Sequence, residues 1–196
     1  VALQVAEQIS DYLVNGAVTN ALNMPSISAE DAPKIKPYVK LGSQIGELVG
    51  QINEDAIQSV EIEYQGSVSE INTDPITSTI VASLLKQQMD SVNMVNALQV
   101  AESRGIEIKT SYTDAAQAHR SLINVIVESK SGARNVAGTL FTGKEPRIVN
   151  IEGVPIEAAL SEHMLCVHND DTPGFIGRLG VLLGEAGYNI SDFRLG

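Results

Sequence analysis

The sequence predicts an α+β fold, dominated by a mixed domain of helices and a mainly antiparallel sheet. Two observations support this prediction. Helical and alternating strand patterns interleave up to Tyr112, and from Ser121 to Ala159 short strand patterns follow one another with only turns between them. A chain of 196 residues is long enough to bury the core of one large domain or two small ones.

Two helices are expected at the start of the chain. The segment from Val1 to Asn15 carries apolar residues at helical intervals, and Gly16 follows it in the position of a left-handed C-cap. Ser28 and Asp31 form an S-x-x-D cap, so a second helix is expected to begin there and to continue to Ile52.

The second helix carries a glycine at every fourth position, at Gly42, Gly46 and Gly50. This spacing resembles a dimerisation stripe of membrane helices. Because Glu47 and Gln51 lie beside the stripe, a close contact between packed helices of a soluble fold is the better interpretation.

Strands and helices alternate in the next part of the chain. The segment from Val60 to Gln65 alternates strictly, as a half-buried strand does. Asp74-Pro75 opens a helix, a further helix is expected over about Asn93 to Arg104, and a strand pattern then runs through Tyr112. The strands of the antiparallel meander follow.

Charge and cysteine content exclude several function classes. The formal net charge of -11, from 24 acidic and 13 basic residues, disfavours a nucleic-acid surface, which needs clustered Lys and Arg. Apolar stretches such as Pro75 to Leu85 are shorter than the roughly 18 residues of a membrane-spanning helix. Cys166 is the only cysteine, which fits a reducing cytoplasm. We expect small-molecule or protein partners, no nucleic acid and no membrane.

The start of the sequence carries no signal-peptide pattern, because an amphipathic helix follows Val1 where a signal peptide would have a basic region and an apolar run. We expect the chain to be part of something longer.

A glycine-rich stretch from Asn169 to Ser191 is the most informative motif. It contains no G-x-G, so it does not match a dinucleotide or nucleotide loop. Asp171 or Thr172 is the expected N-cap of a helix, Pro173 its first residue, and Gly187 its end. The amides of about 174–176, helped by the helix dipole, are expected to attract a small carboxylate.

The residues around this helix start suit a zwitterionic amino acid. Asn169 and Asp171 follow an expected strand, His163 to His168, and project to the same side, while Asn189 starts the returning strand. Asp171 is expected to bind the ammonium group. A second interpretation remains open, in which the segment is only a well-formed cap and turn. Three further glycines lack side chains and are therefore expected to let the helix lie close to a sheet: Gly177, Gly180 and Gly184.

The last segment, "HMLCVHNDDTPGFIGRLGVLLGEAGYNISDFRLG", resembles the first half of the ACT domain that ends members of the D-3-phosphoglycerate dehydrogenase family. "VALQVAEQISDYLVNGAVTNALN" is similar to the helix and connector that close the dehydrogenase portion of that family. "RSLINVIVES", "RNVAGTLF" and "EPRIVNIEG" resemble the intervening domain of its long form. The ACT motif falls on these positions: Asp171, Pro173, Gly174, Ile176, Gly177, Gly187, Asn189 and Ile190.

The resemblance implies three parts. Residues 1–23 are the closing helix and connector, 24–160 the intervening domain of the allosteric substrate-binding type, and 161–196 the first βαβ half of a ferredoxin-like ACT domain. Because the family's ACT domain continues with another strand, helix and strand, a sheet that stops at Gly196 exposes an edge, so the remainder is expected to be disordered or trimmed.

The resemblance also implies an activity for the parent protein. The family oxidises 3-phosphoglycerate to 3-phosphohydroxypyruvate with NAD, the first step of L-serine biosynthesis. The nucleotide loop and the catalytic residues would precede Val1, so this stretch is expected to bind no cofactor and to catalyse nothing itself. Its implied role is allosteric: L-serine binds at ACT interfaces of a cytoplasmic homo-oligomer, either a dimer or a tetramer.

The resemblance assigns candidate site residues. The effector contacts are Asn169, Asp171, Gly174, Phe175, Ile176 and Asn189. A phosphate-bearing substrate is a further partner of the intervening domain, for which the anion candidates are Arg147, Arg134, His119 and Arg120.

Simpler and competing interpretations remain open beside these assignments. Isolated arginines on a meander are often simply solvated. No metal site is expected, because His163 points away from Cys166 and His168, and two ligands make a poor zinc site. For the whole chain the alternatives are a stand-alone amino-acid-sensing module of the ACT type and a purely structural assembly domain.

Overall fold

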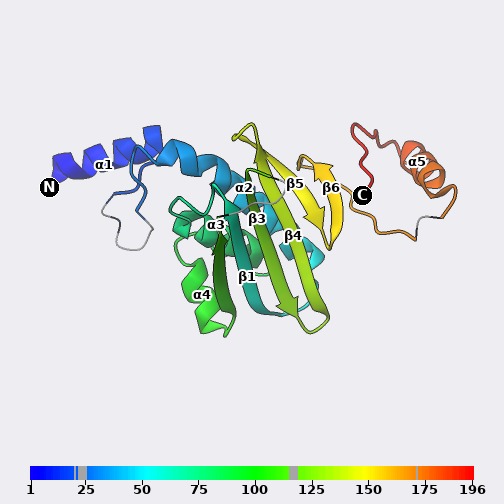
Figure 1. Ribbon diagram of the computed structural model, residues 1–196, viewed down its shortest axis with the longest axis horizontal. Helices are drawn as coiled ribbons and strands as arrows, with labels where there is room; N and C mark the ends of the chain where they lie inside the picture. The colour runs from blue at the N-terminus through cyan, green and yellow to red at the C-terminus, as the bar shows by residue number, and fades with distance from the viewer. Residues whose placement is uncertain (20, 22–25, 115–118, 171) are drawn as a thin grey trace.

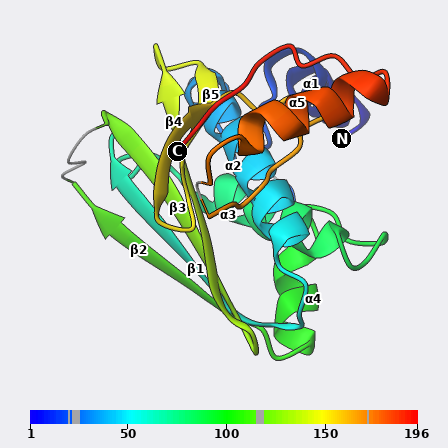
Figure 2. The same ribbon diagram turned by 90° about the vertical axis from the view of Figure 1, so that its right-hand side faces the viewer.

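The predicted α+β fold is confirmed. The computed structural model describes residues 1–19, 21, 26–114, 119–170 and 172–196, and it contains one six-stranded sheet with helices packed on one of its faces (Figures 1 and 2). The helices are α1 (Ala2–Asn15), α2 (Ala32–Ile52), α3 (Asp74–Lys86), α4 (Ala97–Ser103) and α5 (Phe175–Glu185). No helix in these ranges is long and apolar enough to cross a membrane.

The sheet combines one parallel pair with an antiparallel meander. Its order is β2-β1-β3-β4-β5-β6, and only β1 and β2 run parallel, because α3 and α4 form the crossover between them. The four strands of the meander follow one another as predicted. The strands are β1 (Ile57–Gly66), β2 (Glu107–Thr113), β3 (Ser121–Ser129), β4 (Gly132–Phe141), β5 (Glu145–Ile151) and β6 (Val154–Ala158).

Helix α4 is shorter than the helix expected over 93–104. Asn93 accepts hydrogen bonds at its side-chain oxygen from the amides of Val95 (2.9 Å) and Asn96 (3.3 Å), and the Asn96 side-chain oxygen accepts one from the Asn93 amide (2.8 Å). These local bonds satisfy the backbone in a turn, so the helix begins only at Ala97.

The glycines of α2 form the packing contact that the sequence predicts. A Cβ atom on Gly46 would lie 2.5 Å from the Ile80 carbonyl oxygen, and one on Gly50 would lie 2.9 Å from the Leu84 carbonyl oxygen. The backbones of α2 and α3 can therefore approach only because these positions lack side chains. On its other side α2 contacts β4, where a Cβ on Gly138 would meet Leu41 and Ile45 of α2.

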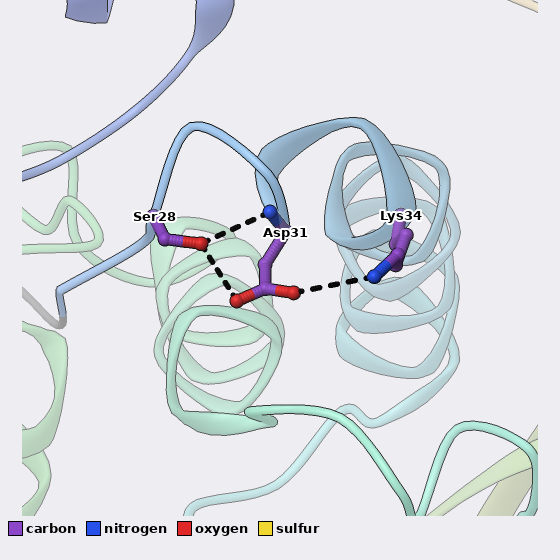
Figure 3. Close-up of polar contacts among 3 residues, drawn as sticks. All are labelled: Ser28, Asp31 and Lys34. Carbon is purple, nitrogen blue, oxygen red and sulfur yellow. Dashed lines mark hydrogen bonds and ion pairs between the residues drawn. The ribbon is translucent and has the colours of Figure 1, made fainter.

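The predicted S-x-x-D pair forms just ahead of α2 (Figure 3), but the helix begins later than expected: Asp31 is the N-cap residue, Ala32 is the first helical residue, and no side chain caps the helix. The Asp31 amide donates to Ser28 Oγ (3.0 Å), Ser28 Oγ donates to Asp31 Oδ2 (2.7 Å), and Lys34 Nζ lies 3.5 Å from Asp31 Oδ1. The Ser28 hydroxyl first, and the Lys34 charge after it, hold the pKa of the Asp31 carboxyl below its usual value.

A buried phenol ties α3 to the parallel strands. Tyr64 of β1 is fully buried, and its hydroxyl lies 2.7 Å from Thr77 Oγ1 of α3. Its ring stacks on Tyr112 of β2 with centroids 5.6 Å apart, and the Tyr112 hydroxyl lies 2.9 Å from Thr73 Oγ1. Burial raises the pKa of Tyr64 well above its usual range.

The two ends of the chain lie outside this core, with α1 and α5 at opposite ends of the molecule (Figure 1). Helix α5 forms as predicted, but the strands expected at His163 to His168 and from Asn189 onward are wrong, because no strand is assigned in the described part of 159–196. A strand needs a neighbour for its backbone hydrogen bonds, and the single sheet ends at β6. The expected packing of three α5 glycines against a sheet is also wrong, because a Cβ would meet nothing within 4 Å at Gly177, Gly180 or Gly184.

We predict that Gly46→Ala lowers the free energy of unfolding by about 1–3 kcal/mol, because the new methyl group collides with the α3 backbone. The higher helix propensity of alanine, about 1 kcal/mol, offsets only part of this loss. Urea denaturation measures the change. Gly180→Ala is the control, because its Cβ enters open space; an unchanged midpoint for Gly46→Ala contradicts the packing role.

We predict that Ser28→Ala raises the pKa of Asp31 toward its usual value, because the strongest hydrogen bond to the carboxylate is lost. In the native protein the lowered pKa contributes stability that is present above the unfolded value of about 3.9 and is lost as the pH falls through the folded pKa. Carboxyl NMR titration measures the shift. Lys34→Gln should raise the pKa of Asp31 less than Ser28→Ala does. A larger shift in Lys34→Gln would show that the Lys34 charge, and not the Ser28 hydrogen bond, is the main cause of the lowered pKa.

We predict that stability declines as the pH rises above about 10, because an unfolded tyrosine ionises there while buried Tyr64 stays protonated. The stability that protonated Tyr64 contributes is complete below the pKa of tyrosine in the unfolded chain. It is lost as the pH rises toward the pKa of Tyr64 in the folded protein. Tyr64→Phe should cost about 1 kcal/mol at neutral pH and flatten this decline, measured by urea midpoints between pH 8 and 11. Tyr188→Phe, at a side chain 69% exposed, should change neither.

Candidate functional site

The start of α5 is the candidate effector site. Gly174 is the N-cap residue and lies in the left-handed region with φ 83°. The Phe175 amide donates to the Thr172 carbonyl (3.2 Å), which forms a turn ahead of the helix. The N-cap expected at Asp171 or Thr172 and the helical position expected for Pro173 are therefore wrong by about two residues, because this turn delays the helix to Phe175.

The end of α5 agrees with the sequence. Gly187 has φ 80°, and the Tyr188 amide donates to the Leu183 carbonyl at 2.9 Å. This bond, from the residue after the left-handed glycine back to the third-last helical residue, is that of a Schellman motif. Gly187 thus ends the helix as predicted.

The structure supplies one cation that the sequence argument missed. Arg178 follows Gly174 by one helical turn, its amide donates to the Gly174 carbonyl (3.0 Å), and its Nη1 lies 3.2 Å from where a Gly174 Cβ would be. The guanidinium group therefore lies beside the expected carboxylate position, where it attracts an anion together with the helix dipole. The i to i+4 spacing from Gly174 was the signal that could have identified it.

The remaining effector candidates do not all lie at the start of α5. Asp171 lies outside the described residues. Asn169 and Phe175 are half-buried, Ile176 is 48% exposed, and Asn189 is exposed beyond the far end of α5. No hydrogen bond or ion pair among the described residues joins Asn189 to the helix start, because the returning strand that would carry it back is not formed.

The anion candidates of the intervening domain divide between two ends of the sheet. Arg147 lies opposite Thr139, and Arg134 is five residues away along β4, or about 17 Å at strand spacing. The Ser121 carbonyl accepts a hydrogen bond from Thr139, so the neighbouring Arg120 lies at the Arg147 end. Arg134 therefore does not share a site with the other two.

Both arginines of the sheet already have carboxylate partners. Arg147 Nη2 is 3.1 Å from Glu145 Oε2, its Nη1 donates to the Pro146 carbonyl (2.9 Å), and its guanidinium lies over the Phe141 ring at 5.9 Å. Arg134 is 3.0 Å from a Glu152 carboxylate oxygen. An incoming phosphate would have to compete with these carboxylates.

The other candidates offer no assembled chemistry. His119 is half-buried and Arg120 exposed. His163, Cys166 and His168 are all exposed, and no group of three or more His, Cys, Asp or Glu in the described residues could hold a metal ion.

Comparison with known proteins decides the family. The model of the D-3-phosphoglycerate dehydrogenase intervening domain matches residues 34–152, which is more than half of the chain and extends from α2 into the turn after β5. The chain belongs to this family.

Relatives extend the similarity beyond the intervening domain. The chain is 33% identical to D-3-phosphoglycerate dehydrogenase of Bacillus subtilis over 197 aligned residues, covering 100% of the chain and 38% of that protein. It is 31% identical to the proteins of the same name from Synechocystis and Archaeoglobus fulgidus, with 100% of the chain covered in each case. The chain spans only 36–38% of the length of these relatives.

Proposed function

We propose that this chain is the regulatory C-terminal portion of an NAD-dependent 3-phosphoglycerate dehydrogenase. The complete enzyme would be a cytoplasmic oxidoreductase that converts 3-phosphoglycerate to 3-phosphohydroxypyruvate in the first step of L-serine biosynthesis. The observation behind this proposal is the match of the intervening-domain family over 34–152, together with relatives of that name aligned along the whole chain. Catalytic and NAD-binding residues would belong to the larger remainder of the enzyme.

The proposed role divides between three parts. Residues 1–23 would join the dehydrogenase portion, 24–160 would be the intervening domain, and 161–196 would belong to an ACT domain. The close contact between α2 and α3 suits the middle part for transmitting a restraint, because close-packed interiors shift as units and deform little.

L-serine is the proposed effector, bound at the start of α5. Its carboxylate would lie at the helix N-terminus near Gly174, with Arg178 beside it as a counter-charge. Asp171 would bind the ammonium group. Asn169 would lie on the same side of the ligand as Asp171. Asn189 would reach the ligand only in an assembled ACT sheet, because within this chain it lies beyond the far end of α5.

Assembly of two or more copies is the proposed means of completing this site. Apolar side chains on and before α5 are strongly exposed: Leu165 is 64% exposed, Val181 60% and Leu182 65%. Clusters of exposed apolar residues favour protein contacts. A homo-oligomer, either a dimer or a tetramer, would bury them and hold the ACT segments of neighbouring subunits together.

A second ligand, the phosphate-bearing substrate, is proposed for the Arg147 end of the sheet. Arg120 lies at the same end and His119 precedes it, whereas Arg134 is too far away to contribute. Binding there would require Glu145 to release Arg147, so we expect a weak site whose affinity falls with added salt.

We expect L-serine to bind the complete enzyme saturably in isothermal titration and to lower its hydride-transfer rate. Arg178→Gln and Asn189→Ala should each weaken binding by about tenfold or more, because each removes a polar contact to the charged ligand. Gln99→Ala, an exposed residue of α4, is the control.

The rival functions give different results in the same titration. A stand-alone sensing module would bind another amino acid without any effect on hydride transfer. A purely structural domain would bind none, and Asp171→Ala would then change stability alone.

A further inference from the structure

The sheet has two edges, and they differ in how far they are shielded. The β6 edge carries Pro155, which has no amide proton to donate, and Gly196 lies so close to Val154 and the Pro155 carbonyl that a Cβ there would collide. At the other edge, β2 is the last strand, and in the described part of the chain it pairs only with β1 (Figure 2). Six of its seven residues are exposed. The outward-pointing backbone groups of β2 are therefore available to another strand.

An apolar hollow adjoins the open β2 edge. It has a volume of about 380 Å³ and lies between α4 and the start of β2. Leu98 of α4 is 42% exposed and lines the hollow together with Ile106 and Ile108. A strand that paired with β2 would also remove this apolar surface from water, which favours association.

The open edge carries one charge of each sign. Glu107 and Lys109 both project from the uncovered face of the sheet, because Ile108 between them packs against the core on the helix-covered face. Their charged groups lie 3.0 Å apart, and the two side chains are 63% and 57% exposed. A lysine on an edge strand normally hinders pairing with another chain. A carboxylate on the incoming strand, placed opposite Lys109, would remove that obstacle.

We propose that β2 pairs antiparallel with β2 of a second copy of this chain, with the two-fold axis at Ile108. In this register Glu107 of each copy lies opposite Lys109 of the other, and the two Ile108 residues lie opposite each other beside the two hollows. Opposite charges and apolar residues that face each other across a strand pair stabilise it. The contact uses the same patch on both copies, so it closes at a dimer and joins the two sheets into one.

Other registers of the same strand pair are less favourable. Residues that lie opposite each other in a ladder project from the same face, so the two-fold axis must pass through a residue. An axis at Glu107 or at Lys109 would place like charges directly opposite each other, which is destabilising. An axis at Thr110 would place Lys109 opposite Ser111 and leave both charges without a partner on the second copy. The charge pattern of β2 therefore specifies the axis at Ile108.

The first test is a charge reversal, followed by sedimentation equilibrium of the full chain. Lys109→Glu should weaken the dimer by at least about tenfold, because two attractive cross-strand pairs become repulsive. Glu107→Lys/Lys109→Glu should restore the native affinity, because it exchanges the charges of both pairs. Lys144→Glu makes the same charge change at an exposed residue in the turn between β4 and β5, and this control should dimerise as the native chain does.

The second test is a disulfide cross-link that depends on the register, made in a Cys166→Ser background. In a mixture of the Glu107→Cys and Lys109→Cys chains, the two cysteines lie directly opposite each other, at a Cα separation of roughly 4.5–5.5 Å that a disulfide can bridge. In either variant alone the cysteines lie diagonally, at about 7–8 Å, which is too far. We expect cross-linked dimer from the oxidised mixture and little from either variant by itself.

Three outcomes would overturn the proposal. The first is unchanged dimer affinity in Lys109→Glu, and the second is an equal yield of cross-link from the mixture and from a single variant. The third is a native chain that sediments as a dimer although the mixture forms no cross-link, because assembly would then use another surface, such as the exposed apolar residues of α5.

The β2 interface does not depend on the proposed serine site. Asn189→Ala changes a residue of the ACT segment and leaves β2 intact, so it should form the β2 pair as the native chain does. Loss of serine binding with an unchanged cross-link would therefore separate failure of the effector proposal from failure of this one.

Discussion

The close approach of α2 to α3 is the contact on which the rest of the intervening domain depends. Gly46 and Gly50 bring the α2 backbone against the carbonyl groups of Ile80 and Leu84, so the two helices form one continuous layer. That layer covers a single face of the sheet. At Gly138 of β4 the missing side chain leaves room for Leu41 and Ile45 of α2. Any side chain at these glycines would separate the layers, and the buried apolar residues between them would lose contact.

The same helix pair explains why the two exposed faces of the molecule differ in chemistry. Its inner side is apolar and faces the sheet, whereas its outer side carries exposed lysines, Lys36 and Lys40 of α2 and Lys86 of α3. The uncovered face of the sheet carries the paired arginine Arg147 and a row of hydrogen-bonded polar side chains that includes Glu63 and Asn124. Each exposed surface therefore has a distinct chemistry, and the core contact fixes how far apart these surfaces lie.

The ends of the chain contrast with this self-sufficient centre. Helices α1 and α5 keep large apolar side chains in solvent, with Leu3 78% and Leu182 65% exposed. A helix of this kind is stabilised mainly by burial of its apolar face against something else. The match to relatives nearly three times as long is in keeping with this, because the proposed partners of both ends are a dehydrogenase portion and other ACT segments.

Local chemistry determined much of this protein by sequence alone: the glycine stripe of α2, the Ser28 and Asp31 pair, and the end of α5 at Gly187 all form as their residue types require. Tertiary structure decided the rest. Whether 163–168 becomes a strand depends on a neighbour that its own residues cannot supply. That Lys86 of α3 lines the same surface groove as Lys36 and Lys40 of α2 depends on how the two helices pack. Hydrogen-bond caps act over a few residues, whereas sheet pairing and surface charge depend on segments distant in sequence.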